Sequence, residues 1–300
     1  MQIGVIISTR NRRHSLRALL ETLDAAKSPD GATVHIFVVD NGSTDSTGEM
    51  LREYVERNGR YPLTVLEQPT PGKARALNQG LASAQSDLTI VLDDDVTVDE
   101  LCLVKHFEAY QHSEFAAIQG RVVPGKDAQG QTADPKRLRE YNIPIIDYGG
   151  DIREIRGLTG TNMSFKREVF KKIGFFDTRL GPGASGFSED TEFSMRIRRA
   201  GFKIGYTPHA VVYHELNPAR YGRAYNRDVE YRKGVSRSIY RHDSILFRVI
   251  PDMFFNCLRY GIYRIFGLSE KAYKTEGRIM KCWGYLVGKV QHQAKSKSTA

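Results

Sequence analysis

The sequence Ile90-Val91-Leu92-Asp93-Asp94-Asp95-Val96 is an apolar run that ends in three consecutive carboxylates. The run predicts a buried strand, and the acids then fall at its C-terminal end, where open α/β sheets bind ligands. Three adjacent like charges repel one another unless a cation lies among them, which favours a divalent metal or a basic side chain nearby. The alternative is a solvated turn before an acidic helix start at Asp99-Glu100.

Three further apolar runs precede this one and alternate with helical patterns. They predict strands at Ile3–Ile7, Val34–Val39 and Leu63–Leu66. Apolar residues at helical spacing predict the connecting helices, which are Ser15–Ala26, a helix that begins at Asp45 or Ser46, and Gly72–Ala84. Repeated strand–helix units predict an α/β fold with a parallel sheet, and they place functional loops at the ends of its strands.

The middle of the chain is less regular. Its Gly-, Gln- and Asp-rich segment Val122–Asp134 predicts a loop, Leu158–Phe165 a strand and Lys166–Lys172 a short helix. Four of the six residues in Gly181–Gly186 are Gly or Pro, which indicates a tightly turned or flexible loop. Ser188 then fits the N-cap of a helix whose first turn is acidic.

Charge is unevenly distributed along the 300 residues, which carry a net charge of +9. Residues 217–300 hold 17 Lys and Arg against 6 Asp and Glu, whereas residues 1–216 are nearly balanced. Three scattered cysteines exclude a disulfide framework or a cysteine-rich zinc site, and with an N-terminus that reads as a strand they predict a cytoplasmic protein. No uncharged apolar run of about 18 residues predicts a transmembrane helix.

Six motifs, taken in order, resemble the nucleotide-sugar-binding part of family 2 glycosyltransferases. They are Val38–Asp45 with Ile6–Arg12 before it, Pro71–Asn78, Leu92–Asp95, Gly160–Phe165, Gly174–Asp177 and Ser188–Phe193. The resemblance covers residues 2–216 and implies the GT-A fold, a mixed α/β sheet with flanking helices. It also implies transfer of a sugar from a nucleotide-sugar donor, with inversion at the anomeric carbon.

The resemblance assigns donor-binding residues and a metal site. Donor contacts are expected from Thr9, Arg10, Asp40, Lys73 and Asp93. Asp93 and Asp95 match the first and third positions of an Asp-x-Asp motif that binds Mn²⁺ or Mg²⁺, although the sequence does not say which acid of the triplet contacts the metal. His214 is expected as a further metal ligand, with His209 a weaker alternative. Asp40 suits the imide N–H of uracil, which favours a UDP-linked donor.

The acceptor side follows from the later motifs. Inverting transfer needs a general base, and the resemblance assigns that role to Asp190, with Glu189 beside it. A carboxylate at a helix start behind a glycine-rich loop suits this role, although acids at a helix N-terminus also stabilise the helix itself. Asn162 is expected to contact an acceptor hydroxyl, and Glu189 is also expected to bind the acceptor.

Residues 217–300 form a basic extension to the predicted catalytic domain, residues 1–216. Tyr221–Tyr240 predicts a basic helix, while Ile245–Phe266 and Ile279–Val290 interleave apolar and aromatic residues with basic ones. Such helices are typical of the surface of anionic membranes, so we expect a peripheral membrane protein with a glycan or lipid-linked acceptor. The alternatives are packing on the catalytic domain and dimerisation.

Two other functions fit parts of the sequence. The basic extension could bind nucleic acid on a non-catalytic scaffold, but no nucleic-acid-binding motif is present and we expect no such partner. A sugar-phosphate nucleotidyltransferase would carry a glycine-rich loop after its first strand, and Ser8–Arg12 contains no glycine. The sequence leaves the sugar, the acceptor and the linkage open.

Overall fold

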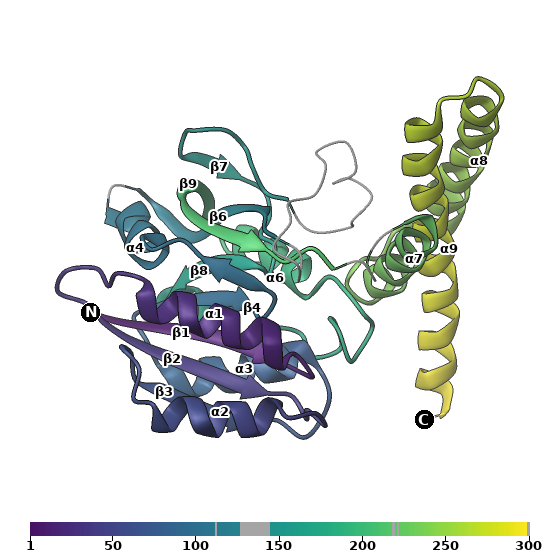
Figure 1. Cartoon of the computed structure of the whole chain (residues 1–300). Helices are drawn as coiled ribbons and strands as arrows, with labels where there is room; N and C mark the ends of the chain where they lie inside the picture. The colour runs from purple at the N-terminus through teal and green to yellow at the C-terminus, as the bar shows by residue number, and fades with distance from the viewer. Residues whose placement is uncertain (112, 127–144, 218–219, 221, 299–300) are drawn as a thin grey trace. The chain divides into compact units, whose positions relative to one another are not determined.

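The computed structural model describes residues 1–111, 113–126, 145–217, 220 and 222–298 (Figure 1). These residues form two compact units. The first unit contains the described residues up to Thr178 and Glu189–Leu216, and the second contains Arg179–Ser188 and the described residues from Asn217 onward. Each unit is described by itself.

The first unit begins with alternating strands and helices. The strands are β1 (Gln2–Thr9), β2 (Thr33–Asp40), β3 (Leu63–Glu67) and β4 (Leu88–Asp93). Helices α1 (Arg13–Ala25), α2 (Thr47–Glu56) and α3 (Lys73–Ala84) connect them. The four strands are parallel in the order β3-β2-β1-β4, so their C-terminal ends lie at one edge of the sheet.

The rest of the unit extends this sheet with antiparallel and parallel strands. They are β5 (Val96–Val98), β6 (Phe115–Pro124), β7 (Arg153–Ile155), β8 (Asn162–Lys166) and β9 (Lys203–His214), and the helices are α4 (Cys102–Gln111), α5 (Arg167–Ile173) and α6 (Glu189–Arg199). The order continues from β4 through β8, β6 and β9 to β5, with β7 paired to β9. The result is the expected mixed α/β sheet with flanking helices.

Alternating side chains of the central strands build a core on each face of the sheet. Val5 and Ile7 of β1 pack with the buried leucines of α1, while Ile6 between them packs with α3 on the other face. Each fully buried leucine of this kind stabilises the fold by roughly 2 kcal/mol. At Gly80 in α3, an added Cβ would lie 2.6 Å from Ile6 Cγ2, so only glycine permits this close helix–sheet contact.

Three local predictions differ from the structure. Val122–Pro124 continue β6 where a loop was expected, and residues 127–134 of that loop lie outside the described residues. Strand β8 begins only at Asn162, four residues later than expected. Ser188 directly precedes α6 but has a left-handed backbone, with φ 76°, in place of the extended backbone of a capping serine.

The second unit is built from helices. They are α7 (Arg223–Tyr240), the π-helical turn η3 (Ile245–Val249), α8 (Ile250–Ile265) and α9 (Ser269–Ser298). Glycines let α7 and α9 cross closely, since a Cβ at Gly234 would lie 2.1 Å from the Lys281 carbonyl oxygen and one at Gly284 would lie 2.0 Å from that of Tyr231. None of the described helices is both long enough and apolar enough to cross a membrane.

Candidate active site

Backbone pairing brings several predicted site residues to one edge of the sheet. In the β1–β2 pair Thr9 lies opposite Asp40, and in the β1–β4 pair Ser8 lies opposite Asp93. The C-terminal ends of β2, β1 and β4 therefore lie side by side at one edge of the sheet. Parallel α/β sheets bind ligands at this edge because the connecting loops there supply polar groups.

Lys73, the first residue of α3, joins two of the predicted motifs. Its Nζ forms an ion pair with Asp93 Oδ1 and lies 3.7 Å from Glu189 Oε1, at the start of α6. The other oxygen of Asp93 accepts a hydrogen bond from Thr161 Oγ1 at 3.0 Å. A single ammonium group thus links the acidic end of β4 to the acidic first turn of α6.

Burial and charge oppose each other in this cluster. Burial lowers the pKa of Lys73, but Asp93 and Glu189 outweigh it, so the net shift of that pKa is upward and the ammonium stays charged. Burial raises the pKa of Glu189 to about 7, against the nearby Lys73 charge. Burial also acts against ionisation of Asp93, but Lys73 holds its pKa below the ordinary value. Asp93 is therefore ionised at neutral pH, whereas the pKa of Glu189 lies close to neutral pH.

Asp94, the middle residue of the triplet, has a hydrogen-bond partner of its own. Its Oδ2 accepts a hydrogen bond from the buried Thr9 hydroxyl at 2.8 Å. Burial, with the Asp95 charge beside it, raises the pKa of Asp94 to about 7. Thr9 consequently points to the triplet from the end of β1, while the next residue, Arg10, is exposed.

Asp95 meets His214 because β5 pairs with the end of β9, where Val96 lies opposite His214. Both residues are buried, and His214 Nε2 lies 3.4 Å from Asp95 Oδ1. The Glu215 carbonyl oxygen, which can only accept, lies 2.9 Å from His214 Nδ1, so Nδ1 carries the proton. The other ring nitrogen, Nε2, faces the Asp95 carboxylate, so the pair can hold a proton between them or a cation that both ligate.

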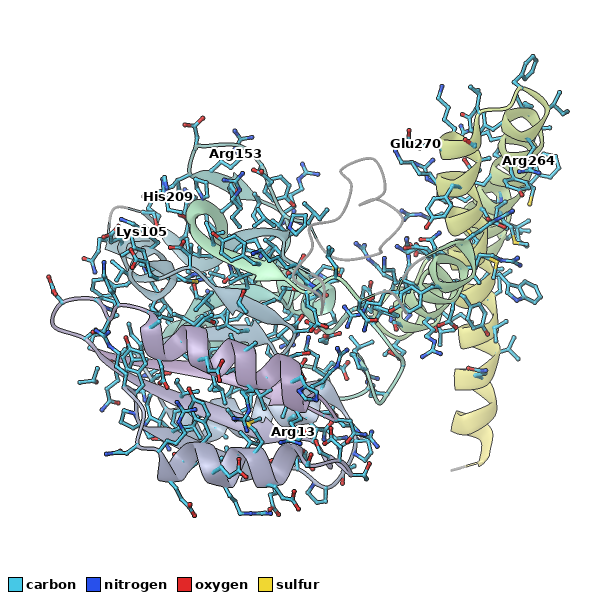
Figure 2. All side chains as sticks on the ribbon, viewed as in Figure 1. Arg13, Lys105, Arg153, His209, Arg264 and Glu270 are labelled. Carbon is cyan, nitrogen blue, oxygen red and sulfur yellow. The ribbon has the colours of Figure 1, made fainter. Side chains whose placement is uncertain are left out.

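Two further groups surround Asp95. Arg12 Nη1 lies 3.7 Å from its Oδ2. A cavity of about 830 Å³ also borders Asp95, and Ser15 of α1 and Glu215, which line it, are joined by a 2.5 Å hydrogen bond. The alternative ligand His209 is exposed on β9 (Figure 2).

The loop after β2 is held by its own polar residues. Asp40 Oδ1 accepts the Ser43 N–H at 2.9 Å, which turns the loop back on the strand end. The buried Asn41 donates to the carbonyl oxygens of Gln68 and Thr70, at 3.0 Å each, and its Oδ1 accepts the Gly72 N–H at 2.7 Å. Asn41 therefore fixes the segment that leads into Lys73.

Asp190, the expected base, is half-buried in the first turn of α6. Its Oδ2 accepts the Gly160 N–H at 3.1 Å, and its Oδ1 accepts the N–H and hydroxyl of Thr191. These bonds place the carboxylate beside the segment that enters β8, next to the Lys73–Glu189 pair.

Asn162 does not occupy the position expected of an acceptor-binding residue. Its side chain is fully buried, and its amide donates to the carbonyl oxygens of Arg121 and Ala210 at 3.1 and 2.9 Å. Its Oδ1 lies 2.7 Å from His106 Nε2, a buried histidine whose pKa burial lowers to about 4. All the polar groups of Asn162 thus serve the core, which leaves none for an acceptor.

Four residues of the site were not assigned from the sequence, namely Arg12, Asn41, Asp94 and Thr161. All four lie inside motifs whose neighbours were assigned. Their position inside these motifs was the available signal. Their hydrogen-bond and ion-pair partners, however, lie on other strands and loops, which the motifs do not reveal.

The sequence matches the family model described as "Glycosyl transferase family 2" over residues 4–174. "Probable glycosyltransferase YdaM" of Bacillus subtilis is 25% identical over 276 residues, which are 87% of this chain and 63% of that protein. The poly-beta-1,6-N-acetyl-D-glucosamine synthase of Staphylococcus aureus is 26% identical over 212 residues, 66% of this chain and 47% of the synthase. The chain therefore spans less than two thirds of these relatives' length.

The fold is similar to that of a mannosyltransferase from Pyrobaculum calidifontis, solved in complex with GDP-Man and Mn²⁺. The TM-score is 0.64 at 18% identity, and the match covers 96% of this chain and 86% of that one. This likeness shows the GT-A fold. Together with the family match over more than half of its length, it confirms the resemblance seen in the motifs: the chain belongs to glycosyl transferase family 2.

Proposed function

We propose that the chain is an inverting glycosyltransferase of polysaccharide or glycoconjugate synthesis. It would transfer a sugar from a UDP-linked donor to a hydroxyl of a glycan or lipid-linked acceptor. The observation that carries the proposal is the contact of Lys73 with both Asp93 and Glu189. This contact joins Asp93, which we assign to the donor, with Glu189, which we assign to the acceptor.

The donor would bind along the ends of β1, β2 and β4. The Asp40 carboxylate would accept the imide N–H of uracil, and Lys73 would hold negative charge on the diphosphate as a point charge. Arg10, exposed just beyond β1, would add a second positive charge near the phosphates. Asp93 would orient the donor from the strand end while it keeps Lys73 in place.

Asp190 would take the proton of the acceptor hydroxyl. The hydroxyl oxygen forms a bond to the anomeric carbon as the bond from that carbon to the diphosphate oxygen breaks, and the nucleoside diphosphate leaves with the electron pair. The Gly160 N–H would orient the Asp190 carboxylate for this step. Glu189, with a pKa near 7, would hydrogen-bond an acceptor hydroxyl beside it.

The chemistry of Asp95 and His214 fits a divalent cation. The Asp95 carboxylate faces Nε2 of an imidazole whose other nitrogen is held by a backbone carbonyl, and a metal-bound histidine is usually held in this way. Within the described part of the chain, no group of three or more His, Cys, Asp or Glu side chains is arranged to hold a metal. From the chemistry of this pair alone we assign Asp95 and His214 as the protein ligands of Mn²⁺ or Mg²⁺, which would neutralise charge on the diphosphate when bound.

Asp93 was expected to share the metal as well as the donor. Its Oδ1 is paired with Lys73 and its Oδ2 accepts from Thr161, so we assign it to the donor alone.

Donor hydrolysis tests the proposal. The full chain is incubated with Mn²⁺ and with UDP- or GDP-linked sugars in turn, and release of the nucleoside diphosphate is measured. We expect release from a UDP-sugar at a rate that falls in the Lys73→Met variant. Release from a GDP-sugar alone would refute the nucleobase assignment, and release from none would refute the proposal.

We also propose that residues 217–300 hold the protein at an anionic membrane surface. Their 17 basic residues against 6 acidic ones support this location, and a membrane-bound enzyme could use a lipid-linked acceptor.

A further inference from the structure

Helix α8 and the turn η3 carry large apolar side chains that no part of the described chain covers. Phe247 is 83% exposed, Phe254 65% and Ile265 82%. Leu246, Ile250, Phe255, Leu258 and Phe266 are also exposed. Positions 247, 250, 254, 258 and 265 follow helical spacing, so they form one continuous stripe. We call this stripe, together with Leu246, Phe255 and Phe266, the apolar face.

The other side of α8 borders a cationic cavity. It has a volume of about 280 Å³ and is lined by residues of α7, η3, α8 and α9. Its basic residues are Arg237, Arg248, Arg259, Arg278 and Lys281, and its acidic residues are Asp243 and Asp252. Asp243 pairs with Arg237 at 2.6 Å and with Arg248 at 2.9 Å. The cavity therefore keeps an excess of positive charge after its internal ion pairs are formed.

Three of the cations have no carboxylate partner in the described part of the chain. These cations are Arg259, Arg278 and Lys281, none of which lies within 4.0 Å of a carboxylate oxygen of the described residues. Burial lowers the pKa of Lys281; the Glu230 carboxylate acts against this shift, while the charges of Lys233 and Arg237 add to it. An anion in the cavity would offset this repulsion.

Asn256, which lines the cavity, carries a buried polar atom. Asn256 is 8% exposed, and its Nδ2 donates to the Asp252 carbonyl oxygen at 2.6 Å. Its Oδ1 has no hydrogen-bond partner in the described chain, although Asn256 lines the cavity. A buried acceptor without a partner is costly, so the cavity suits a ligand that brings hydroxyl or N–H donors as well as negative charge.

We propose that η3 and α8 lie in the surface of an anionic membrane, with the apolar face among the acyl chains and the headgroup of an anionic phospholipid in the cationic cavity. Glycerol hydroxyls of such a headgroup would donate to Asn256 Oδ1, and its phosphate would face Arg259, Arg278 and Lys281. A second protein could cover an apolar face equally well, but it would leave the adjacent cations without a counter-charge. The inference rests on the membrane location proposed above and is independent of the transfer reaction.

The ends of the helical pair support an orientation in the plane of the membrane surface. Arg264, at the end of α8, and Glu270, at the start of α9, are both exposed charged residues (Figure 2). Arg248 and Arg259, on the cavity side of η3 and α8, are also exposed. Basic residues that border an apolar stripe lie at the level of lipid phosphates when such a helix lies in the surface.

The test measures sedimentation of the full chain with vesicles of phosphatidylcholine alone or with added phosphatidylglycerol. We expect binding to the mixed vesicles and at least tenfold weaker binding to phosphatidylcholine. F247S/F254S changes only exposed side chains, so we expect a folded protein whose vesicle binding falls at least tenfold. Unchanged binding of this variant, or no binding of the wild-type chain to mixed vesicles, would overturn the proposal.

A matched pair of variants isolates the cavity. R259Q/R278Q removes two charges that line it, whereas R264Q/K274Q removes two exposed charges of the same helices outside it. General attraction to the membrane predicts an equal loss for both, roughly fivefold per charge. The cavity predicts a further loss for R259Q/R278Q alone, and equal losses would overturn the headgroup site.

Two controls distinguish a membrane surface from a dimer interface and from a site for free phosphate. If the apolar face mediates dimerisation, the wild-type chain elutes as a dimer that F247S/F254S converts to a monomer, with no vesicle binding, and the proposal fails. Sedimentation competed away by inorganic phosphate, but insensitive to F247S/F254S, would indicate a soluble phosphate site and would also overturn it. Donor hydrolysis without vesicles is measured for every variant, so loss of membrane binding is distinguished from failure of the proposed transferase activity.

Discussion

Lys73 Nζ lies 3.7 Å from Glu189 Oε1 while it forms an ion pair with Asp93, so one buried cation is shared by carboxylates from two motifs far apart in the sequence. A buried charge that loses its partner is strongly destabilising. The two halves of the site are therefore coupled through Lys73, and this coupling gives the first prediction.

Replacing Lys73 with Met should impair both donor binding and the site itself. We expect kcat/KM for the donor to fall by at least ~100-fold, which is about 3 kcal/mol of transition-state stabilisation. We also expect a lower melting temperature, because Asp93 and Glu189 lose their counter-charge. Arg75→Met, at the exposed third residue of α3, is the control and should change neither quantity. Wild-type donor kinetics in Lys73→Met would rule out its role.

Asp190→Asn should separate binding from chemistry. We expect transfer to fall by roughly 10³-fold or more, because an amide cannot take the acceptor proton, while the Kd for the donor stays within about twofold. Glu189→Gln should raise the acceptor KM and retain measurable transfer. Calorimetry with UDP and a transfer assay give the two readouts. The reverse pattern, with Glu189→Gln inactive and Asp190→Asn active, would move the base to Glu189.

Asp95→Asn and His214→Gln should each weaken binding of Mn²⁺ by at least ~tenfold, because each removes one of two protein ligands. Titration calorimetry with Mn²⁺ alone measures this without any turnover. His209→Gln, which alters an exposed histidine of the same strand, should leave Mn²⁺ binding unchanged. Equal affinity in wild type and His214→Gln would exclude this histidine as a ligand.

The pKa of Glu189 makes stability depend on pH. Its value near 7 in the folded chain lies above its ordinary value of 4.5, so between these values the folded state binds more protons than the unfolded state. The free energy of unfolding contributed by this group is thus full below about pH 4.5 and is lost as pH rises through 7. In Glu189→Gln we expect this component, roughly 1–3 kcal/mol, to vanish from a pH series of denaturant titrations. An identical pH slope in both proteins would contradict the assignment.

Asn162→Ala should act on stability and leave acceptor binding alone. The change leaves the carbonyl oxygens of Arg121 and Ala210 and one nitrogen of His106 without partners in the core. We expect a loss of about 2–4 kcal/mol in the free energy of unfolding. If the folded variant instead shows a raised acceptor KM at unchanged stability, the acceptor role first expected for Asn162 is restored.

The features that were easiest to predict are those that depend only on residues close together in the sequence. An apolar run followed by acids predicts a strand end, and the register of β1, β2 and β4 places Asp40 and Asp93 on one edge of the sheet, as such runs require. The flanking helices were predicted in the same way, whereas the mixed sheet was implied by the family resemblance, because the strand–helix repeats alone predicted a parallel sheet. Strand β8 was predicted to begin too early because Leu158 is apolar and buried without being part of the strand.

The assignments that failed or were missed depend on partners distant in the sequence. The side chain of Asn162 could contact a sugar or hydrogen-bond to buried polar groups of the core. Only the positions of His106 and Ala210 in the folded chain distinguish these two roles. Likewise, nothing near Lys73 in the sequence indicates that Glu189 is its second partner. Burial, which raises the pKa of Asp94 to about 7, is also a property of the packed fold and not of three adjacent acids.

Asn41 ties the loop after β2 to the segment that leads into α3 and Lys73, through its bonds to Gln68, Thr70 and Gly72. A change of nucleobase preference made by remodelling that loop would therefore also displace the lysine. Under the proposed role of Asp40, engineering of donor choice should keep Asn41 intact and vary Asp40 alone, so that the anchoring of α3 is preserved.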